Sequence, residues 1–293
     1  MFKNLTMTRR ESVRLLGSAF TAVGSARAQG ESAPSLAPGL PMSPERMALI
    51  DSFQAKADGL DKRFEAHVNK GAWAMPYRLF RPAETGKAPL ILYLHGSGGL
   101  GDDNEKQLGL GNVFGTRVWA LQENQKRFPC YIVVPQTDRG WVNYKAPSGG
   151  GVAEVIPGFG EGARVAVEIV QALCRKFAID RRRIYVMGQS MGGAGTWNMI
   201  AYRPLLFGAA VACCGSKTWD DAARSIHTPL WNFHGDADET VPVAVSRDRI
   251  SAMRKAGGRP LYTEYAGVGH NVWEWAFTEP ALVDWVFGQH RPA

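Results

Sequence analysis

The sequence predicts an α/β protein built on a mostly parallel, doubly wound sheet. Apolar runs such as Pro89–Leu94 and Cys130–Val134 are typical of strands that are covered on both faces. Amphipathic stretches such as Ala163–Phe177 alternate with these runs and predict helices. Strands that alternate with helices favour a parallel sheet. At 293 residues and 45% hydrophobic content, the chain is long enough for one large domain and short for two.

The first 28 residues are typical of an export signal. Residues 8–16, Thr-Arg-Arg-Glu-Ser-Val-Arg-Leu-Leu, resemble a twin-arginine motif, and the apolar run Leu15–Ala26 follows. Ala26 and Ala28 then mark a cleavage site, so we expect a mature chain from Gln29 in the periplasm or outside the cell. The alternative is an amphipathic helix that frays. The run is too short to span a bilayer, so we expect no stable membrane anchor.

Residues 29–44 are rich in Ala, Pro, Ser and Gly without periodicity and predict a flexible linker. A single domain is predicted over residues 45–293. Its first helix is expected to begin at Pro44 with Ser43 as the N-cap, because proline is favoured at the first helical position and serine just before it.

The remaining elements follow in chain order. Two antiparallel strands, Arg63–Val68 and Tyr77–Phe80, are expected on either side of Gly71. The other predicted strands are Pro89–Leu94, Cys130–Val134, the run that ends at Met187, Ala209–Cys213, Leu230–Phe233 and Leu261–Tyr265. The predicted helices are Trp119–Lys126, Ala163–Phe177, Gly192–Tyr202 and Glu279–Gln289.

Charge and cysteine content exclude some classes of function. The formal net charge is +7, and the first 28 residues carry +4 of it, from five basic residues and one acidic residue. The +3 that remains is too mild to indicate a nucleic-acid partner. The four cysteines, Cys130, Cys174, Cys213 and Cys214, lack the spacing of a zinc site. One disulfide stays open in an exported chain, although buried thiols are the simpler interpretation of Cys213 and Cys214.

The strand that ends at Met187 leads into Gly188-Gln189-Ser190-Met191-Gly192, and a helical pattern follows. This strand-turn-helix context is the one in which G-x-S-x-G exposes a nucleophilic serine. Glycine at 188 and 192 removes side chains that would collide in so tight a turn. The Met191 amide is expected to face the same way as the Ser190 hydroxyl and to stabilise an oxyanion.

A serine hydroxyl needs a base, and the base needs an acid that fixes its tautomer. Asp238 and His270 follow in that order, each just after a predicted strand, so both are expected at the carboxyl edge of the sheet with Ser190. Asp236 competes as the acid, but an aspartate there is expected to stabilise its own turn. His234 is likewise expected to brace the turn.

His95-Gly96-Ser97-Gly98-Gly99 directly follows the strand Pro89–Leu94. Such a loop turns a backbone N–H toward the nucleophile, and Ser97 is the expected second oxyanion donor. The alternative is an ordinary glycine-rich turn. A phosphate loop is disfavoured, because neither G-K-[ST] nor a G-x-G-x-x-G that opens a helix is present.

These residues resemble the α/β-hydrolase superfamily, and more narrowly the bacterial phospholipase/carboxylesterase and "predicted peptidase" group, which is related to family 1 carbohydrate esterases and polyhydroxybutyrate depolymerases. The resemblance covers about residues 60–290. Its matching motifs are Met75–Phe80, His95–Gly99 with Gly101–Asn104, Pro135-Gln136, Gly188–Gly193, His234–Asp238 with Val241-Pro242, and Gly269-His270. It implies an α/β-hydrolase fold with Ser190 as nucleophile, Asp238 as acid, His270 as base and the Ser97 and Met191 amides as oxyanion donors. Ser97 departs from the small residue usual after His-Gly.

Only Ser216–Pro229 separates two successive strands where many such hydrolases insert a cap, so we expect no large cap domain and an open cleft. Trp141, in the long loop Gln136–Gly162, and Trp273 are candidate substrate contacts. The alternative for both is packing of loops onto the sheet.

The sequence therefore predicts an exported serine esterase that acts on carboxylic esters, including feruloyl, acetyl or hydroxyalkanoate esters linked to a polymer. A serine peptidase of the same fold and a non-catalytic carbohydrate- or polymer-binding protein are the alternatives. No cofactor and no metal are implied, and the oligomeric state is left open.

Overall fold

The computed structural model describes residues 43–71, 73–83, 86–145, 154–215 and 222–291, all within one compact unit that spans residues 35–293. The export signal and most of the linker predicted from the sequence lie outside the described residues. Ser43 caps the first helix as predicted, because its side chain accepts a hydrogen bond from the Arg46 backbone N–H at 3.3 Å.

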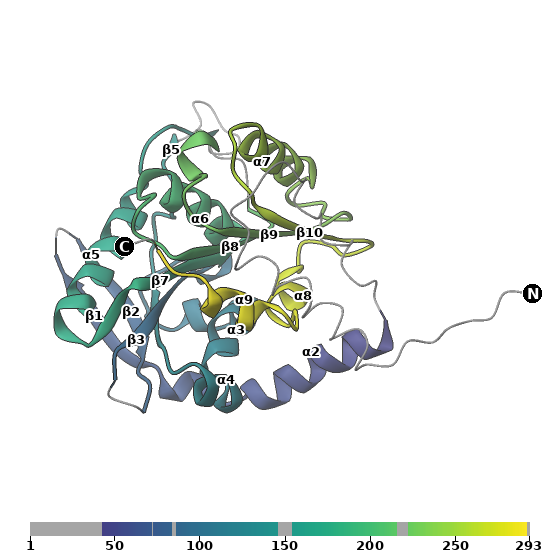
Figure 1. Ribbon diagram of the computed structural model, residues 1–293. Coiled ribbons are helices and arrows are strands. Elements are labelled where there is room, and N and C mark those ends of the chain that lie inside the picture. Colours follow the sequence, from purple (N-terminus) through teal and green to yellow (C-terminus); the bar gives the residue numbers. More distant parts are fainter. Residues whose placement is uncertain (1–42, 72, 84–85, 146–153, 216–221, 292–293) are drawn as a thin grey trace, which may run out of the picture. The chain divides into compact units, whose positions relative to one another are not determined.

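An eight-stranded sheet in the order β1-β2-β4-β3-β7-β8-β9-β10 forms the centre of the unit (Figure 1). The strands are β1 (Glu65–Lys70), β2 (Ala74–Phe80), β3 (Ala88–Leu94), β4 (Tyr131–Pro135), β7 (Ile179–Gln189), β8 (Ala209–Cys213), β9 (Leu230–Gly235) and β10 (Leu261–Tyr265). Within this order, every neighbouring pair of strands in β4-β3-β7-β8-β9-β10 is parallel. Strand β2 is antiparallel to both β1 and β4. The mostly parallel, doubly wound sheet is thus confirmed.

Helices cover both faces of the sheet (Figure 1). They are α2 (Pro44–Ala57), α3 (Asn112–Arg117), α4 (Gln122–Arg127), α5 (Glu161–Lys176), α6 (Met191–Tyr202), α7 (Ala244–Lys255), α8 (Trp273–Phe277) and α9 (Leu282–Gly288). A small hairpin, β5 (Tyr144–Lys145) with β6 (Glu154–Val155), lies in the loop before α5.

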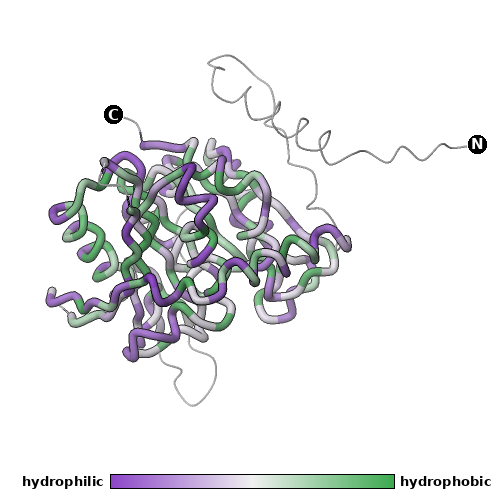
Figure 2. Tube along the Cα trace, turned by 90° about the horizontal axis from the view of Figure 1, so that it is seen from below, coloured by the Kyte–Doolittle hydropathy of each residue, from purple (hydrophilic) through white to green (hydrophobic). Residues whose placement is uncertain are grey.

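The side chains of β3 show how the two faces are filled, because successive residues of a strand point to opposite faces. Leu90 and Leu92 belong to a core cluster that also includes apolar residues of α5 and α6, such as Val165 and Trp197. Tyr93 points the other way, and its ring packs edge-on against Phe277 of α8 at 5.9 Å. Figure 2 shows hydrophobic and hydrophilic residues alternating along the helical turns, as expected for helices with one buried face.

The helices of the structure differ from the predicted ones in several places. The predicted helix Trp119–Lys126 is broken at Leu121 into a 3-10 turn, Val118–Ala120, and α4. The Asn124 side chain donates to Val118 O at 2.7 Å and satisfies a carbonyl that the break leaves without a helical partner. Helix α7 was not predicted, because its only buried residues are Ser246, Ile250 and Met253, which give a weak apolar period.

Between β8 and β9, the described residues form only a 3-10 turn, Ala222–Ser225, and hold no cap domain. All four cysteines are free thiols. No helix in the described ranges has the length and apolar content needed to cross a membrane.

Candidate active site

Ser190 occupies the turn between β7 and α6 in a backbone conformation that few residues adopt. Its φ is 53° and its ψ is −119°, in a region that costs an L-residue free energy and persists where the surrounding fold enforces it. The enforcement comes from close packing. A Cβ added at Gly192 would lie 1.9 Å from Leu94 O, and one at Gly188 would lie 2.5 Å from Gly192 O. Both positions therefore require glycine, as the sequence pattern predicted.

The structure brings Ser190 together with His270 and Asp238, although 80 residues separate the serine from the histidine. His270 Nε2 lies 2.9 Å from Ser190 Oγ, and His270 Nδ1 lies 2.8 Å from Asp238 Oδ2. Asp238 follows β9 and His270 follows β10, so each side chain stands at the carboxyl edge of the sheet. Since an ionised carboxylate only accepts, His270 donates from Nδ1 and is left to accept the serine proton at Nε2.

Asp238 is held by four donors and its side chain is 0% exposed. The Thr240 and Val241 backbone N–H groups donate to Oδ1 at 2.9 and 2.8 Å. Oδ2 lies 2.8 Å from His270 Nδ1 and 3.2 Å from His234 Nε2. Donors on both oxygens fix the plane of the carboxylate.

His234 contacts the acid and not only the turn that the sequence assigned to it. Its Nε2 also lies 2.9 Å from Val241 O, which can only accept, so Nε2 carries a hydrogen. Its Nδ1 lies 2.6 Å from Ser246 Oγ, which in turn accepts from Asn232 Nδ2 at 3.0 Å. The Ser246 hydroxyl therefore donates to Nδ1. Burial lowers the pKa of His234, which keeps the imidazole neutral in this arrangement.

Asp236, the competitor for the acid role, lies elsewhere. Its Oδ1 accepts the Gly267 backbone N–H at 2.7 Å, and the residue is exposed. It thereby ties the loop after β9 to the loop after β10, and its carboxylate forms no bond to His270 among those of the described residues.

The two predicted oxyanion donors are the first residues of helical turns. Ser97 opens the 3-10 turn Ser97–Gly99 directly after β3, and Met191 opens α6. The N–H groups at a helix start have no carbonyl one turn earlier to donate to, so both are available to an oxyanion. Gly99 N donates to Gly96 O at 2.9 Å, and Gly96 N donates to Asn112 Oδ1 at 3.0 Å, which fixes the turn. No local pattern in the sequence predicted this role of Asn112.

Trp141 does not line an open surface, contrary to the sequence-based expectation of a substrate contact. It is 0% exposed, its Nε1 donates to His95 O at 2.9 Å, and its ring packs edge-on against the His95 ring. The buried indole therefore supports the loop that begins at His95, after β3. Trp273 is half-buried and packs edge-on against His270, with 5.4 Å between ring centroids.

His95 is a second support of this loop that the sequence did not single out. Its Nε2 accepts the Thr137 backbone N–H at 3.2 Å, which leaves Nδ1 to donate to Gly96 O at 2.7 Å. The ring is 0% exposed, and this burial lowers the pKa of His95 to about 4. The neutral tautomer is therefore the one that the folded loop holds.

We expect stability to fall as the pH is lowered from 7 to 5, because His95 gains a proton below pH 6.5 only in the unfolded chain. This difference costs about 2 kcal/mol of unfolding free energy by pH 5, and the loss levels off near pH 4. Urea unfolding of the wild type and His95→Gln at both pH values measures it, and the variant should lose less. If the wild-type His95 ring titrates by NMR between pH 8 and 5, the explanation is wrong.

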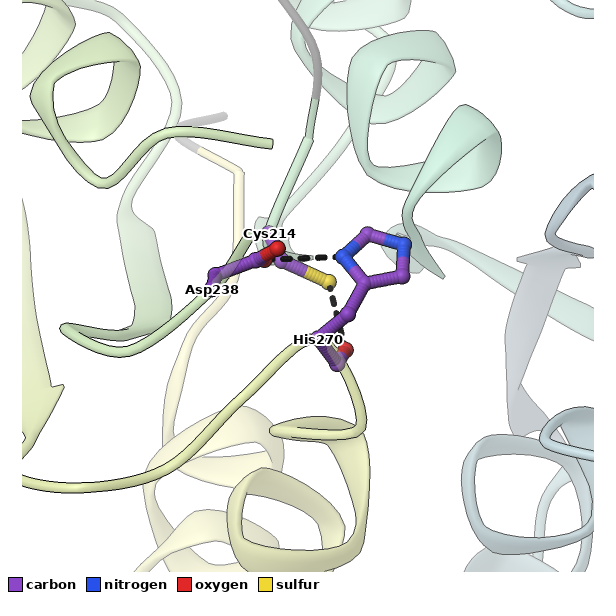
Figure 3. Close-up of side chains that lie close together, drawn as sticks. All are labelled: Cys214, Asp238 and His270. Atoms are coloured by element: carbon purple, nitrogen blue, oxygen red, sulfur yellow. Dashed lines mark hydrogen bonds and ion pairs between the residues drawn. The ribbon is translucent and has the colours of Figure 1, made fainter. Parts of the chain in front are cut away.

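Figure 3 shows Cys214 beside the Asp238–His270 pair, its Sγ directed at the His270 carbonyl oxygen, 3.5 Å away. Within the described residues, one atom from each of these three side chains lies within 4.8 Å of the others, a spacing that a metal ion requires. Burial raises the pKa of the Cys214 thiol, which disfavours the thiolate that a metal would bind. The aspartate and the histidine also already bond to each other, so the set fits a hydrogen-bonded pair better than a metal centre.

A mostly parallel eight-stranded sheet, with a strained serine between a strand and a helix, defines the α/β-hydrolase class of folds. The Phospholipase/Carboxylesterase family model matches residues 157–279, which include all three residues of the Ser190–His270–Asp238 set. No curated protein matches the sequence.

Solved structures agree with this class. A thermostable esterase matches with 31% identity and a TM-score of 0.72, over 79% of this chain and 64% of the esterase. A CE1 ferulic acid esterase from the anaerobic fungus Anaeromyces mucronatus matches with 14% identity and a TM-score of 0.53, over 73% of this chain and 88% of that one. An acylaminoacyl peptidase from Pyrococcus horikoshii matches with 15% identity and a TM-score of 0.54, over 77% and 41%. The chain is related to the α/β-hydrolase superfamily, and it spans about 64% of the length of the thermostable esterase.

Proposed function

We propose that this protein is a serine esterase that hydrolyses carboxylic esters through Ser190, His270 and Asp238. The observation that carries the proposal is the continuous pair of contacts from Ser190 Oγ to His270 Nε2 (2.9 Å) and from His270 Nδ1 to Asp238 Oδ2 (2.8 Å). The esterases among the matched structures and the matched family description support the same reaction class.

In the proposed mechanism, His270 takes the Ser190 proton while Oγ attacks the ester carbonyl. The Met191 and Ser97 amides stabilise the oxyanion of the tetrahedral intermediate. His270 then gives the proton to the departing alcohol, and the acyl group remains on Ser190. Water attacks the acyl-enzyme with His270 again as base, which releases the acid and restores the serine. Asp238 keeps the ring in the required tautomer and stabilises the imidazolium.

The substrate class follows from what surrounds Ser190. The described connection between β8 and β9 holds only a short 3-10 turn, so no cap domain from that connection encloses the serine. We propose that the site accepts bulky esters, including feruloyl, acetyl or hydroxyalkanoate groups linked to a polymer. We also propose that the protein is exported by its first 28 residues and acts in the periplasm or outside the cell.

Specific observations bear on the two alternative functions, a serine peptidase and a non-catalytic binding protein. A serine peptidase of the same fold would use the same three residues, and an acylaminoacyl peptidase is among the matched structures. This chain, however, spans only 41% of that peptidase. A non-catalytic carbohydrate- or polymer-binding protein has no use for a serine held at a φ of 53° against a histidine.

A fluorophosphonate probe and a substrate panel test the proposal. We expect stoichiometric labelling of Ser190, located by peptide mass spectrometry, because only an activated serine reacts. We expect hydrolysis of p-nitrophenyl, feruloyl, acetyl-xylan or polyhydroxybutyrate esters. We expect the p-nitrophenyl esters to be hydrolysed faster than p-nitroanilides of the same acyl groups. Absence of labelling would favour a binding protein, and faster cleavage of the anilides would favour a peptidase.

A further inference from the structure

Leu110 combines two features that are unfavourable for a leucine in a folded protein. Its side chain is 74% exposed, and its φ is 49°, in the left-handed region that favours glycine and asparagine. It lies between two glycines, Gly109 and Gly111, that tolerate such a turn more easily. Neither the backbone conformation nor the exposed methyl groups stabilise the fold.

Contacts place this leucine beside the proposed reaction centre. Its Cδ1 lies 3.3 Å from where a Cβ of Gly98 would stand, so the side chain reaches the oxyanion turn. A Cβ on Gly111 would meet Gln189 Nε2 at 2.7 Å and the Trp273 ring at 2.8 Å. Residue 111 thus packs between the residue before the nucleophile and the indole that contacts His270.

The next residue locks this segment in place. Asn112 is 2% exposed, accepts the Gly96 N–H through Oδ1 and donates to Lys106 O at 3.4 Å. The left-handed turn at Leu110 is therefore held on one side by the oxyanion loop and on the other by Trp273. Strained residues that a rigid surrounding enforces are concentrated at ligand-binding sites.

We propose that Leu110 is a substrate-contact residue that packs against an apolar group of the ester larger than acetyl, on the side of the carbonyl that faces the oxyanion turn. The apolar group is either the acyl chain or the alcohol, since both extend from the carbonyl. The side chain is exposed without substrate because its apolar partner is the substrate. This inference rests on the proposed esterase function and adds the residue that selects the ester.

The variant Leu110→Asn separates a substrate contact from a structural role. Asparagine favours a positive φ, so we expect the melting temperature to rise by roughly 2–4 °C. We expect kcat/KM for ethyl hexanoate or for hexyl acetate to fall about tenfold, because one leucine contact with an apolar chain is lost. Hydrolysis of ethyl acetate should stay within about twofold, since neither its acyl group nor its alcohol is long enough to reach Leu110. Whichever long-chain ester is affected identifies the acyl or the alcohol side.

Leu205→Asn is the matched control, because Leu205 is 66% exposed and lies after α6 outside the site. It should leave the ratio of ethyl hexanoate to ethyl acetate turnover unchanged. If ethyl acetate is hydrolysed but Leu110→Asn leaves both long-chain ratios at the wild-type value, Leu110 is not a substrate contact and the inference is overturned. If the wild type hydrolyses no ester, the proposed function is overturned and the inference with it.

Discussion

Replacement of Ser190 by alanine is expected to lower kcat/KM for p-nitrophenyl acetate by about 10⁴-fold or more, which corresponds to roughly 5 kcal/mol of transition-state stabilisation. Without Oγ, His270 Nε2 loses the hydroxyl that lies 2.9 Å away, and no acyl-enzyme can form. Some acceleration over water should remain, because the Met191 and Ser97 amides are backbone groups and survive the substitution. Initial rates and burst kinetics on the purified variant measure both quantities.

Ser225→Ala is the matched control for this substitution. Ser225 is buried on the 3-10 turn Ala222–Ser225, and its hydroxyl has no hydrogen-bond partner among the described residues. Its loss should leave kcat/KM within about twofold and stability unchanged or slightly improved. If Ser190→Ala keeps more than about a tenth of the activity while folding normally, Ser190 is not the nucleophile.

Asp238→Asn is expected to reduce kcat by about 10⁴-fold with the fold retained. Four donors face the two oxygens of Asp238, and an amide offers only one acceptor atom. If the amide oxygen stays on the Thr240 and Val241 N–H groups, its NH₂ faces His270. The ring must then accept at Nδ1, carry its hydrogen at Nε2 and donate to Ser190, so it can no longer act as base.

The opposite orientation of the amide sets NH₂ against two backbone N–H groups, which leaves buried donors unpaired. Either way the base is impaired or the loop is destabilised.

Asp236→Asn is the matched control, since its side-chain oxygen can still accept the Gly267 N–H. We expect that variant to stay within about threefold of wild type. Equal losses in the two variants would contradict the assignment of Asp238 as the acid.

Several features of the site follow from local sequence patterns. Apolar runs that end in polar or glycine-rich segments predicted β3, β7, β9 and β10, and parallel strands carry the residues that follow them to one edge. Ser190, Asp238 and His270 each come after such a strand, which is why their proximity was predictable although up to 80 residues separate them. The glycines at 188 and 192 were predictable because the turn excludes a Cβ.

Other features depend on contacts that no local pattern encodes. The sequence named Trp141 as a candidate substrate contact with loop packing as the alternative, because an aromatic in a glycine-rich loop has the same local sequence whether it faces solvent or packs against His95. The link from His234 to Ser246 was missed because α7 has too weak a period to be predicted, and the hydrogen bond needs that helix in place. Asn112 bonds Gly96 from 16 residues further along the chain, and no local pattern predicts the positive φ of the nearby Leu110.

The sequence by itself determined the class of fold, the order of the nucleophile, acid and base candidates, and the edge of the sheet where they meet. The sequence also favoured Asp238 over Asp236 as the acid, and the structure places Asp238 against His270. The tertiary structure alone decided that His95 and Trp141 are buried supports and that Leu110 stands at the oxyanion turn. The physical reason is the separation along the chain of the residues that interact. Strand and turn preferences arise from neighbouring residues, whereas burial and hydrogen-bond partners are set by side chains that only the packed sheet and its helices bring together.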